Sequence, residues 1–233
     1  MLFYHYTNIG PRSENEDALN VVEYHEYSIA SIADGVGSSQ AGKYASSYAV
    51  DTFFKMVSPS NFDKLVEIIK KIHDDLIEYS IVNTKKKNSA ATTFTACVIQ
   101  NMKLIGIHVG DSKLYILRGN GLRQLSKEHS EAARLHREKL INYDEYKHYP
   151  RKNVIESALG VPNMLHIDTF NFDLESRDRI ILSTDGFHEL FNKSSLRDMS
   201  VNNIKCEDFY NELVASVNVQ KLRDNTSFIL MEI

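Results

Sequence analysis

Three apolar segments of this chain each end in an aspartate that stands beside a glycine. The pairs are Asp34-Gly35, Gly110-Asp111 and Asp185-Gly186. Two more acidic positions, Glu16-Asp17 and Asp224, stand just before segments with a strand-like pattern. If these strands end at one rim of a sheet, their carboxylates lie together there. The fold must then bring distant parts of the chain to one rim.

Carboxylates gathered in this way need a partner. Within ~4–6 Å of one another they raise each other's pKa values, and burying them unpaired is costly. An all-oxygen set, without His or Cys at metal spacing, favours the hard ions Mg²⁺, Mn²⁺ or Ca²⁺. A single Asp-Gly pair at a strand end is commonly only a turn. Five acidic positions with this placement favour a metal site.

Arg12 adds a complementary charge, four residues before Glu16. A guanidinium beside a metal-filled acidic site suits bidentate binding of a phosphate. An arginine near acidic residues is also commonly one half of a salt bridge. Two metals and an arginine together indicate a site for a phosphoryl group, with a metal-activated water as nucleophile.

The periodicity of apolar residues predicts many short strands and few helices. Helices are expected over 41–56, over 62–82 with Asn61 as its cap, and over 206–217. The four strands predicted between 92 and 125 suggest an antiparallel meander. Strands without regular strand–helix alternation favour an α+β layered fold with antiparallel sheets, in one domain over 1–233. The predicted strands are 18–22, 27–33, 92–100, 103–109, 113–118, 122–125, 166–172, 179–183 and 227–233.

Composition narrows the class of protein. Among 233 residues, 27 basic and 31 acidic side chains give a net charge of −4, which does not favour a nucleic-acid partner. Cys97 and Cys206 are too few for a disulfide framework and are expected to be buried thiols. We expect no signal peptide, no membrane span and a cytoplasmic location. The basic run Lys85–Lys87 is expected to be a solvated loop, with docking of an acidic partner as the alternative.

The residues around these acidic positions resemble the motifs of the type-2C metal-dependent serine/threonine protein phosphatases, bacterial type. The likeness follows the family's order along nearly the whole chain, so it is much more specific than any one motif. The matching segments are Arg12 to Asp17, Ala33 to Gly37, Ala91 to Thr93, His108 to Ser112, Ser157 to Gly160, Ser183 to Gly186 and Asp224 to Ser227.

This resemblance implies an αββα sandwich, in which two antiparallel β-sheets are flanked by helix pairs. It implies two Mn²⁺ or Mg²⁺ ions, with a hydroxide that bridges them as nucleophile. Asp34 would bridge both ions, and the Gly35 carbonyl would join one of them. The remaining roles that it implies are Asp185 and Asp224 on the other ion, Glu16 and Asp17 through coordinated water, Arg12 on the substrate phosphate, and Asp111 at a weaker third metal site.

The chain departs from the family pattern at two informative positions. Val36 stands where many eukaryotic members carry a histidine proposed as general acid, so another group or a water must protonate the leaving oxygen. Glu189 stands where an aspartate often supports the third metal. The segment 131–153 corresponds to a flap beside the site, which we interpret as a substrate-selecting lid. His108 and His129 are interpreted as structural histidines.

The function predicted is hydrolysis of phosphoserine and phosphothreonine in proteins phosphorylated by a serine/threonine kinase. We expect the phosphatase to be a monomer with neither nucleic-acid nor membrane partners. Two alternatives share the fold. One is a non-catalytic adaptor that binds a partner without turnover, which the intact acidic set disfavours. The other is a partner-switching enzyme that acts on a single regulatory protein.

Overall fold

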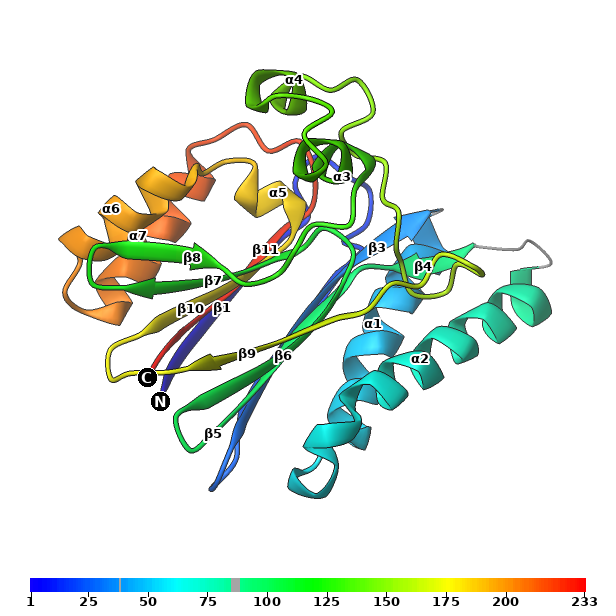
Figure 1. The fold of residues 1–233 in the computed structure, drawn as a ribbon, viewed down its shortest axis with the longest axis horizontal. Helices are drawn as coiled ribbons and strands as arrows, with labels where there is room; N and C mark the ends of the chain where they lie inside the picture. Colours follow the sequence, from blue (N-terminus) through cyan, green and yellow to red (C-terminus); the bar gives the residue numbers. More distant parts are fainter. Residues whose placement is uncertain (38, 85–88) are drawn as a thin grey trace.

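Two antiparallel sheets lie face to face, and a layer of helices covers the outer face of each (Figure 1). The computed structural model describes residues 1–37, 39–84 and 89–233. This arrangement confirms the α+β fold class and the αββα sandwich. The Lys85–Lys87 run lies outside the described residues. No helix in these ranges is both long enough and apolar enough to cross a membrane.

The first sheet combines the two ends of the chain with its middle. Its strand order is β1-β11-β10-β7-β8, and every neighbouring pair is antiparallel. The strands are β1 (Leu2–Asn8), β7 (Lys113–Arg118), β8 (Gly121–Gln124), β10 (Arg179–Ser183) and β11 (Thr226–Glu232).

The second sheet has the order β2-β3-β5-β6-β9, also antiparallel, and a short strand β4 pairs with the far end of β3. The long strand β3 therefore has two partners along one edge, β5 and then β4. The strands are β2 (Asp17–Glu23), β3 (Ser28–Gly37), β4 (Ala90–Thr92), β5 (Phe94–Gln100), β6 (Lys103–Val109) and β9 (Asp168–Asp173).

Helices cover the outer faces of the sheets and one end of the sandwich. α1 (Ser39–Met56) and α2 (Leu65–Tyr79) pack on the second sheet, whereas α6 (Lys193–Asn202) and α7 (Cys206–Asn218) pack on the first. Two short helices, α3 (Glu131–Arg137) and α4 (Tyr143–Lys147), stand above the end of the sandwich (Figure 1). The one-turn helix α5 (Asp185–His188) follows β10.

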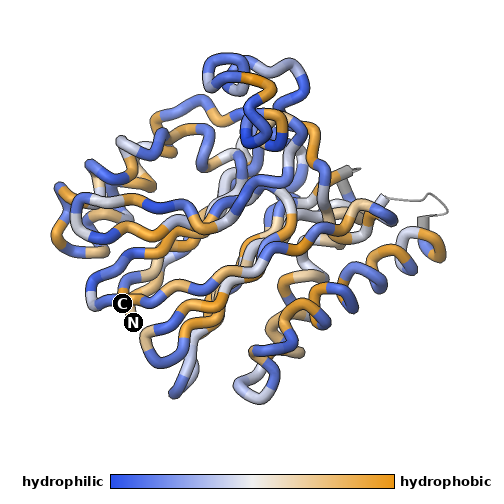
Figure 2. Tube along the Cα trace, in the orientation of Figure 1, coloured by the Kyte–Doolittle hydropathy of each residue, from blue (hydrophilic) through white to orange (hydrophobic). Residues whose placement is uncertain are grey.

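Alternation along the strands divides the core into three apolar layers. In β3, Ile29 and Ala33 pack toward α1 and α2, while Ala30 and Ile32 pack between the sheets. A third layer lies between the first sheet and α6–α7. Figure 2 shows apolar residues along the strands and an apolar stripe on the helices. Cys97 lies between the sheets and Cys206 in the third layer, and both are buried free thiols as predicted.

The apolar stripe of α2 offers a matched test of core packing. Ile69 is fully buried, whereas Ile81, in the following π-turn, is 55% exposed. We expect Ile69→Val to lower the free energy of unfolding by about 1 kcal/mol, because one buried methylene is lost. Ile81→Val should change it by less than about 0.5 kcal/mol. Urea unfolding followed by circular dichroism measures both, and equal effects would contradict this assignment of the core.

The prediction that the four strands between 92 and 125 form one meander is wrong. β5 and β6 pair in the second sheet, and β7 and β8 pair in the first. Between them, Gly110–Ser112 carries the chain from one sheet to the other. Alternation identifies a strand by its half-buried face. It does not identify the neighbouring strand, and here the tight turn at Gly110 joins two sheets instead of two partners.

The predicted helix over 62–82 is divided into three parts. A 3-10 helix, η1 (Pro59–Lys64), precedes α2, and a short π-helix, η2 (Ser80–Thr84), follows it. Asn61 does not cap α2, so that prediction is wrong. Its side chain accepts from the Ser58 amide at 2.8 Å and donates to the Met56 carbonyl at 2.7 Å. Asn61 therefore closes the preceding turn, and the residue before α2 is Lys64.

Candidate metal centre

Asp17 and Asp34 face each other across neighbouring strands. In the antiparallel register of β2 and β3 they form a directly opposed pair. The main chain at Asp34 is held on both sides. Its amide donates to Thr93 Oγ1 at 3.0 Å, and its carbonyl accepts from Thr92 Oγ1 at 2.9 Å. The second sheet thus contributes two carboxylates at one rim.

The first sheet contributes two more carboxylates, Asp185 and Asp224. β10 ends at Ser183, and Asp185 begins α5; Asp224 lies just before β11, the neighbour of β10. Thr184 joins the two sheets, because its Oγ1 donates to Asp17 Oδ2 at 2.9 Å. The negative charges of Asp17, Asp185, Asp111 and Asp224 all act on Asp34. The acidic residues predicted from strand ends therefore converge at one rim of the sandwich.

Burial and mutual repulsion disfavour the charged forms of these carboxyls. Both causes, burial first, raise the pKa of Asp17 to about 7, that of Asp111 to about 7 and that of Asp185 to about 6. The pKa of Asp34 is raised well above its ordinary value by burial and then by the surrounding carboxylates. A site that holds these protons near neutral pH can exchange them for a cation.

Three buried carboxylate oxygens at this rim lack a hydrogen-bond donor among the described residues. They are Oδ1 of Asp17, of Asp111 and of Asp185. Leaving buried acceptors unsatisfied is expensive, and hard divalent cations would satisfy such oxygens by coordination. The donor set is entirely oxygen, so the residues present fit Mg²⁺ or Mn²⁺.

Two glycines let Glu16 approach the same rim. A Cβ on Gly42 of α1 would lie 2.2 Å from Glu16 Oε2, and a Cβ on Gly35 would lie 2.5 Å from the backbone of Gly42. The Gly35 amide donates to the Glu16 carbonyl at 3.1 Å. Asn225 fixes the other side of Glu16, because its Oδ1 accepts from the Glu16 amide at 2.9 Å. The predicted Glu16 and Gly35 thus lie against each other.

Arg12 binds Asp224 with two parallel hydrogen bonds. Nε lies 2.8 Å from Oδ1, and Nη2 lies 2.5 Å from Oδ2. Both interpretations made from the sequence thus remain compatible with the position of Arg12. It forms a salt bridge, and because a guanidinium has five donors, it keeps further N–H groups for an anion. Its side chain is 57% exposed at the mouth of the site.

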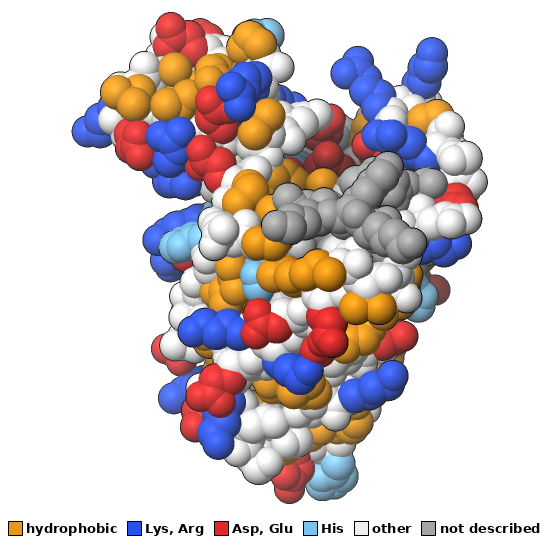
Figure 3. Space-filling view, turned by 90° about the vertical axis from the view of Figure 1, so that its right-hand side faces the viewer, with side chains coloured by type: hydrophobic (Ala, Val, Ile, Leu, Met, Phe, Trp, Pro, Cys, Tyr) orange, Lys and Arg blue, Asp and Glu red, His pale blue; other side chains and the backbone are white. Residues whose placement is uncertain are grey.

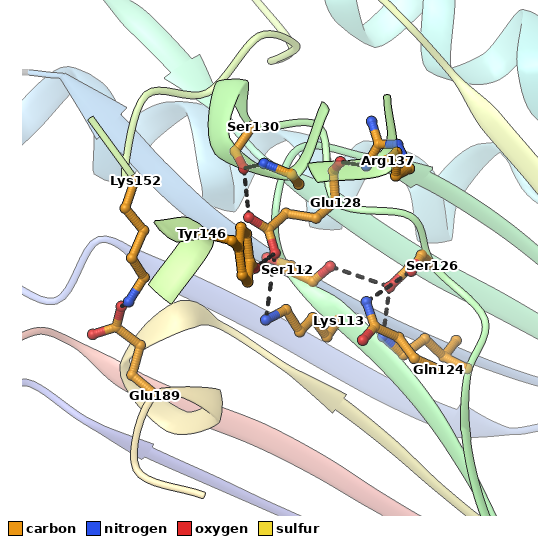
Figure 4. A network of polar contacts seen from close by, with 12 residues as sticks. Ser112, Lys113, Gln124, Ser126, Glu128, Ser130, Arg137, Tyr146, Lys152 and Glu189 are labelled. Carbon is orange, nitrogen blue, oxygen red and sulfur yellow. Dashed lines mark hydrogen bonds and ion pairs between the residues drawn. The ribbon is translucent and has the colours of Figure 1, made fainter. Parts of the chain in front are cut away.

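Asp111 lines a smaller pocket together with Lys113, Glu128 and Tyr146. These three residues belong to a polar network that holds the flap (Figure 4). Glu128 Oε2 accepts from the Tyr146 hydroxyl at 3.0 Å and lies 3.5 Å from Lys113 Nζ. Burial, then the charges of Asp185 and Glu128, raises the pKa of Asp111. Tyr146 belongs to α4, so the half-buried Glu128 links the flap to β7, the strand that follows Asp111.

A second contact joins the flap to the acidic rim. Lys152 Nζ lies 2.6 Å from Glu189 Oε1, one turn after Asp185 (Figure 4). Glu189, considered above as support for a third metal, is therefore the ionic partner of the flap. Within the flap, Arg151 pairs with Glu131 at 3.0 Å. The segment 131–153 is thus folded, and it contacts the surroundings of the acidic rim through Tyr146–Glu128 and Lys152–Glu189.

The two histidines interpreted as structural, His108 and His129, are each held by a hydrogen bond. His108 is fully buried, and its Nδ1 lies 2.8 Å from Thr95 Oγ1. Burial, then the charge of His129, lowers the pKa of His108 to about 3. His129 Nδ1 accepts from the Gly110 amide at 3.1 Å. Both contacts agree with structural roles for these rings.

His129, His166 and Asp168 form a compact group with ligand atoms within 4.8 Å of one another. His129 Nε2 lies 3.3 Å from Asp168 Oδ2, and His166 Nε2 lies 3.1 Å from Asp168 Oδ1. Because His129 Nδ1 is an acceptor, its neutral ring carries the proton on Nε2. A metal on Nε2 would require loss of that proton. The group is better described as two rings that share one carboxylate.

Sequence reasoning missed the residues that position the acids. Thr93, Thr184 and Asn225 hold Asp34, Asp17 and the Glu16 amide, respectively. All three lie in segments that match the family's motifs, but the sequence analysis assigned them no role. Val36, opposite Ala91 in the β3–β4 ladder, supplies no proton donor.

An open cleft of about 930 Å³ adjoins the acidic rim. Its walls come from the flap, from α5 and from the segment before β11. Figure 3 shows it as a notch with acidic side chains on its floor and basic side chains on its walls. This volume is at the upper end of that of small-molecule pockets, about 300–1,000 Å³. The notch can therefore admit a side chain together with its neighbours.

Comparison with known proteins places this chain in a family. A model of the family described as protein phosphatase 2C matches residues 6–225. The serine/threonine phosphatase stp of Listeria welshimeri is 27% identical over 230 residues, which cover 95% of this chain and 91% of that protein. Protein phosphatase PhpP of Streptococcus pneumoniae is 25% identical over 236 residues, which cover 97% and 94%.

Solved structures share the fold. The serine/threonine phosphatase of S. agalactiae superposes with a TM-score of 0.89 at 24% identity, covering 98% of each chain. The catalytic domain of the phosphatase PstP, solved in complex with 2 manganese ions, superposes with a TM-score of 0.84 at 19% identity, covering 99% of this chain and 97% of that one.

Proposed function

The chain belongs to the protein phosphatase 2C family, and from that premise we propose that it hydrolyses phosphoserine and phosphothreonine in proteins with two bound divalent cations. The observation that carries this proposal is the set of buried carboxylate oxygens without donors beside the exposed Arg12. Such a site offers oxygen ligands for cations at its floor and an anion-binding group at its mouth.

Asp34, Asp185, Asp224 and the Gly35 carbonyl would hold the two cations, with Glu16 and Asp17 bound through water. The choice of Mn²⁺ or Mg²⁺ rests on the oxygen donor set and on the manganese complex of the related PstP. When bound, the cations would supply a hydroxide nucleophile at neutral pH and stabilise negative charge on the phosphoryl oxygens. A weaker third cation would use Asp111 with Asp185.

The chain's own groups orient the substrate. Arg12 would bind two phosphoryl oxygens with the N–H groups that Asp224 leaves free. Asp17, fixed by Thr184, would hold water at the rim. Val36 has no proton to give, so the leaving serine or threonine oxygen would take its proton from water. The flap would exclude competing solvent while the phosphoryl group is bound.

The substrates would be proteins phosphorylated by a serine/threonine kinase, as the names of the relatives suggest. We propose that residues 1–233 act as one phosphatase domain. The cytoplasmic location and the monomeric state stay predictions.

Release of phosphate from a phosphothreonine peptide tests the function directly. With Mn²⁺ the protein should release phosphate, and with EDTA it should not. Isothermal titration in parallel should detect two bound Mn²⁺ ions. Binding of Mn²⁺ without phosphate release from any phosphopeptide in a broad panel would instead support the non-catalytic adaptor. Release from one phosphoprotein alone would support the partner-switching enzyme.

Thr184 provides a test of how the site is positioned. Thr184→Val removes the hydroxyl that donates to Asp17 while keeping the shape of the side chain. Loss of such a contact typically lowers metal affinity by about 10- to 100-fold, and we expect a fall of that size in Mn²⁺ affinity by isothermal titration. Thr184→Ser keeps the hydroxyl and should retain most of the affinity. Equal losses in the two variants would assign the effect to packing.

A further inference from the structure

The cleft at the metal centre has a basic rim. Five basic residues line it: Arg12, Arg151, Lys152, Lys221 and Arg223. The basic wall visible beside the notch in Figure 3 contrasts with the acidic floor. The chain as a whole carries a net charge of −4, so this gathering of positive charge runs against the overall composition.

Three of the five charges already have partners. Arg12 pairs with Asp224, Arg151 with Glu131, and Lys152 with Glu189. Lys221 and Arg223 are exposed, and the described residues offer neither of them a hydrogen bond or an ion pair. Both belong to the segment between α7 and β11 that leads into Asp224. They are therefore free to bind an anion brought by a substrate.

Cations bound at the floor of the cleft would change the electrostatic environment of a bound substrate. Two divalent cations would offset most of the carboxylate charge there, and the phosphoryl group would bind the cations and Arg12. Among the basic residues that line the cleft, Lys221 and Arg223, on one wall, are the two without an ionic partner among the described residues. The opposite wall, formed by the flap, presents Arg151 and Lys152 in pairs. A substrate segment in the cleft thus passes between basic side chains.

We propose that this phosphatase selects phosphorylated segments that carry a second anionic group within a few residues of the phosphoresidue, and that Lys221 and Arg223 recognise that group. The proposal rests on the proposed phosphatase function and specifies its substrates. An extended chain advances about 3.3 Å per residue, and Arg223 is adjacent in sequence to the metal-site residue Asp224. Anions only a few residues away are therefore the ones within reach.

The second anion has two possible sources with the same chemistry. One is an aspartate or glutamate carboxylate, and the other is a second phosphorylated residue. A phosphate carries about −1.5 to −2 charges at pH 7. A doubly phosphorylated segment would therefore bind Lys221 and Arg223 more strongly than a segment with one carboxylate. The two sources are separate arms of the test.

Four phosphothreonine peptides, identical except at flanking positions, make the comparison. The flanks carry Gln, Glu, Lys or a second phosphothreonine, and kcat/KM is measured with Mn²⁺ for each. An exposed ion pair contributes a factor of about 1.4 to 5. Two such contacts predict that the Glu peptide is hydrolysed about two- to 25-fold more efficiently than the Gln peptide. The preference should shrink as NaCl rises from 50 to 500 mM.

Charge reversal at Lys221 and Arg223 tests whether these two residues cause the preference for an anionic flank. In Lys221→Glu/Arg223→Glu the ratio of kcat/KM for the Glu peptide to that for the Lys peptide should fall below one. Lys70→Glu, on the exposed face of α2, introduces the same kind of charge change away from the cleft and should keep the wild-type ratio. Because each ratio compares two substrates of one protein, changes in overall activity cancel.

The outcomes separate this proposal from the phosphatase function. If all four peptides are hydrolysed with equal efficiency, the function stands and the selectivity is wrong. An unchanged Glu-to-Lys ratio in the double variant would likewise overturn the role of Lys221 and Arg223. If no peptide is hydrolysed although Mn²⁺ binds, the phosphatase proposal itself fails. A gain for the second phosphothreonine alone would identify phosphate, and a gain for Glu would identify carboxylate.

Discussion

Asp34→Asn is expected to lower kcat/KM toward a phosphothreonine peptide by at least about 100-fold, because even residues that only support a metal ligand typically contribute 10- to 100-fold to metal affinity. Asparagine keeps the size of the side chain and one oxygen but removes the charge that would be shared by both cations. Isothermal titration should show weaker Mn²⁺ binding in the same variant. Phosphate release and Mn²⁺ binding must fall together if Asp34 acts through the metal.

The stability of Asp34→Asn without metal gives an independent readout. Asp34 is half-buried among Asp17, Asp185, Asp111 and Asp224. Loss of solvation, and then the charges of these carboxylates, raise its pKa well above the ordinary range. Removing that carboxyl relieves repulsion, so the variant in EDTA at pH 8 should melt at a higher temperature than the wild type. A lower melting temperature would show that the loss of activity reflects misfolding.

Asp173→Asn is the matched control for both measurements. Asp173 is an exposed acid at the end of β9, away from the cleft. It should keep wild-type turnover, Mn²⁺ affinity and melting temperature. A wild-type rate in Asp34→Asn would reject the assignment of Asp34 as a metal ligand.

The acidic rim could be predicted because its chemistry repeats along the chain. Each Asp-Gly or Gly-Asp pair ends an apolar run, and burying so many carboxylates without cations is unfavourable. The local sequence pattern was therefore sufficient to predict that Asp34, Asp111 and Asp185 lie at the acidic rim. The hydrophobic faces of α2 and of β10 were predictable for a similar reason, since one helix or strand contains its own period.

The partners of those elements could not be predicted in the same way. Tyr4 and Tyr6 of β1 pack on Tyr210 and Phe228, yet Leu2–Asn8 is an edge strand with polar residues on it, and its pattern alone gave no strand. α6 was missed because few of its residues are buried. The hydroxyl of Thr184 reaches an acid 167 positions away in the chain, a contact that exists only once the two sheets meet.

Protonation of the acidic rim predicts how metal and pH act together on stability. Asp17 and Asp111 have pKa values raised to about 7, and Asp185 to about 6. Unfolded aspartates titrate near pH 3.9. Between about pH 4 and 7 the folded, metal-free protein therefore binds more protons than the unfolded chain. The rim's contribution to the free energy of unfolding falls as pH rises through this window and stays low above it.

Mn²⁺ competes with those protons, so its effect should grow with pH. Bound at about 100 times its Kd, a ligand adds about 2.7 kcal/mol, which corresponds to a rise of about 5–10 °C in a chain of this size. We expect a rise of this order at pH 8 and little at pH 5, measured as the melting temperature with Mn²⁺ minus that with EDTA.

Taking this difference removes the contributions of groups outside the rim. His108, for example, with its pKa lowered to about 3, destabilises the fold at acidic pH with and without metal. Asp34→Asn should show a much smaller Mn²⁺-dependent rise at pH 8, whereas Asp173→Asn should match the wild type. If the rise were equal at pH 5 and pH 8, Mn²⁺ would not be replacing protons on these aspartates, and the cation would have to bind elsewhere.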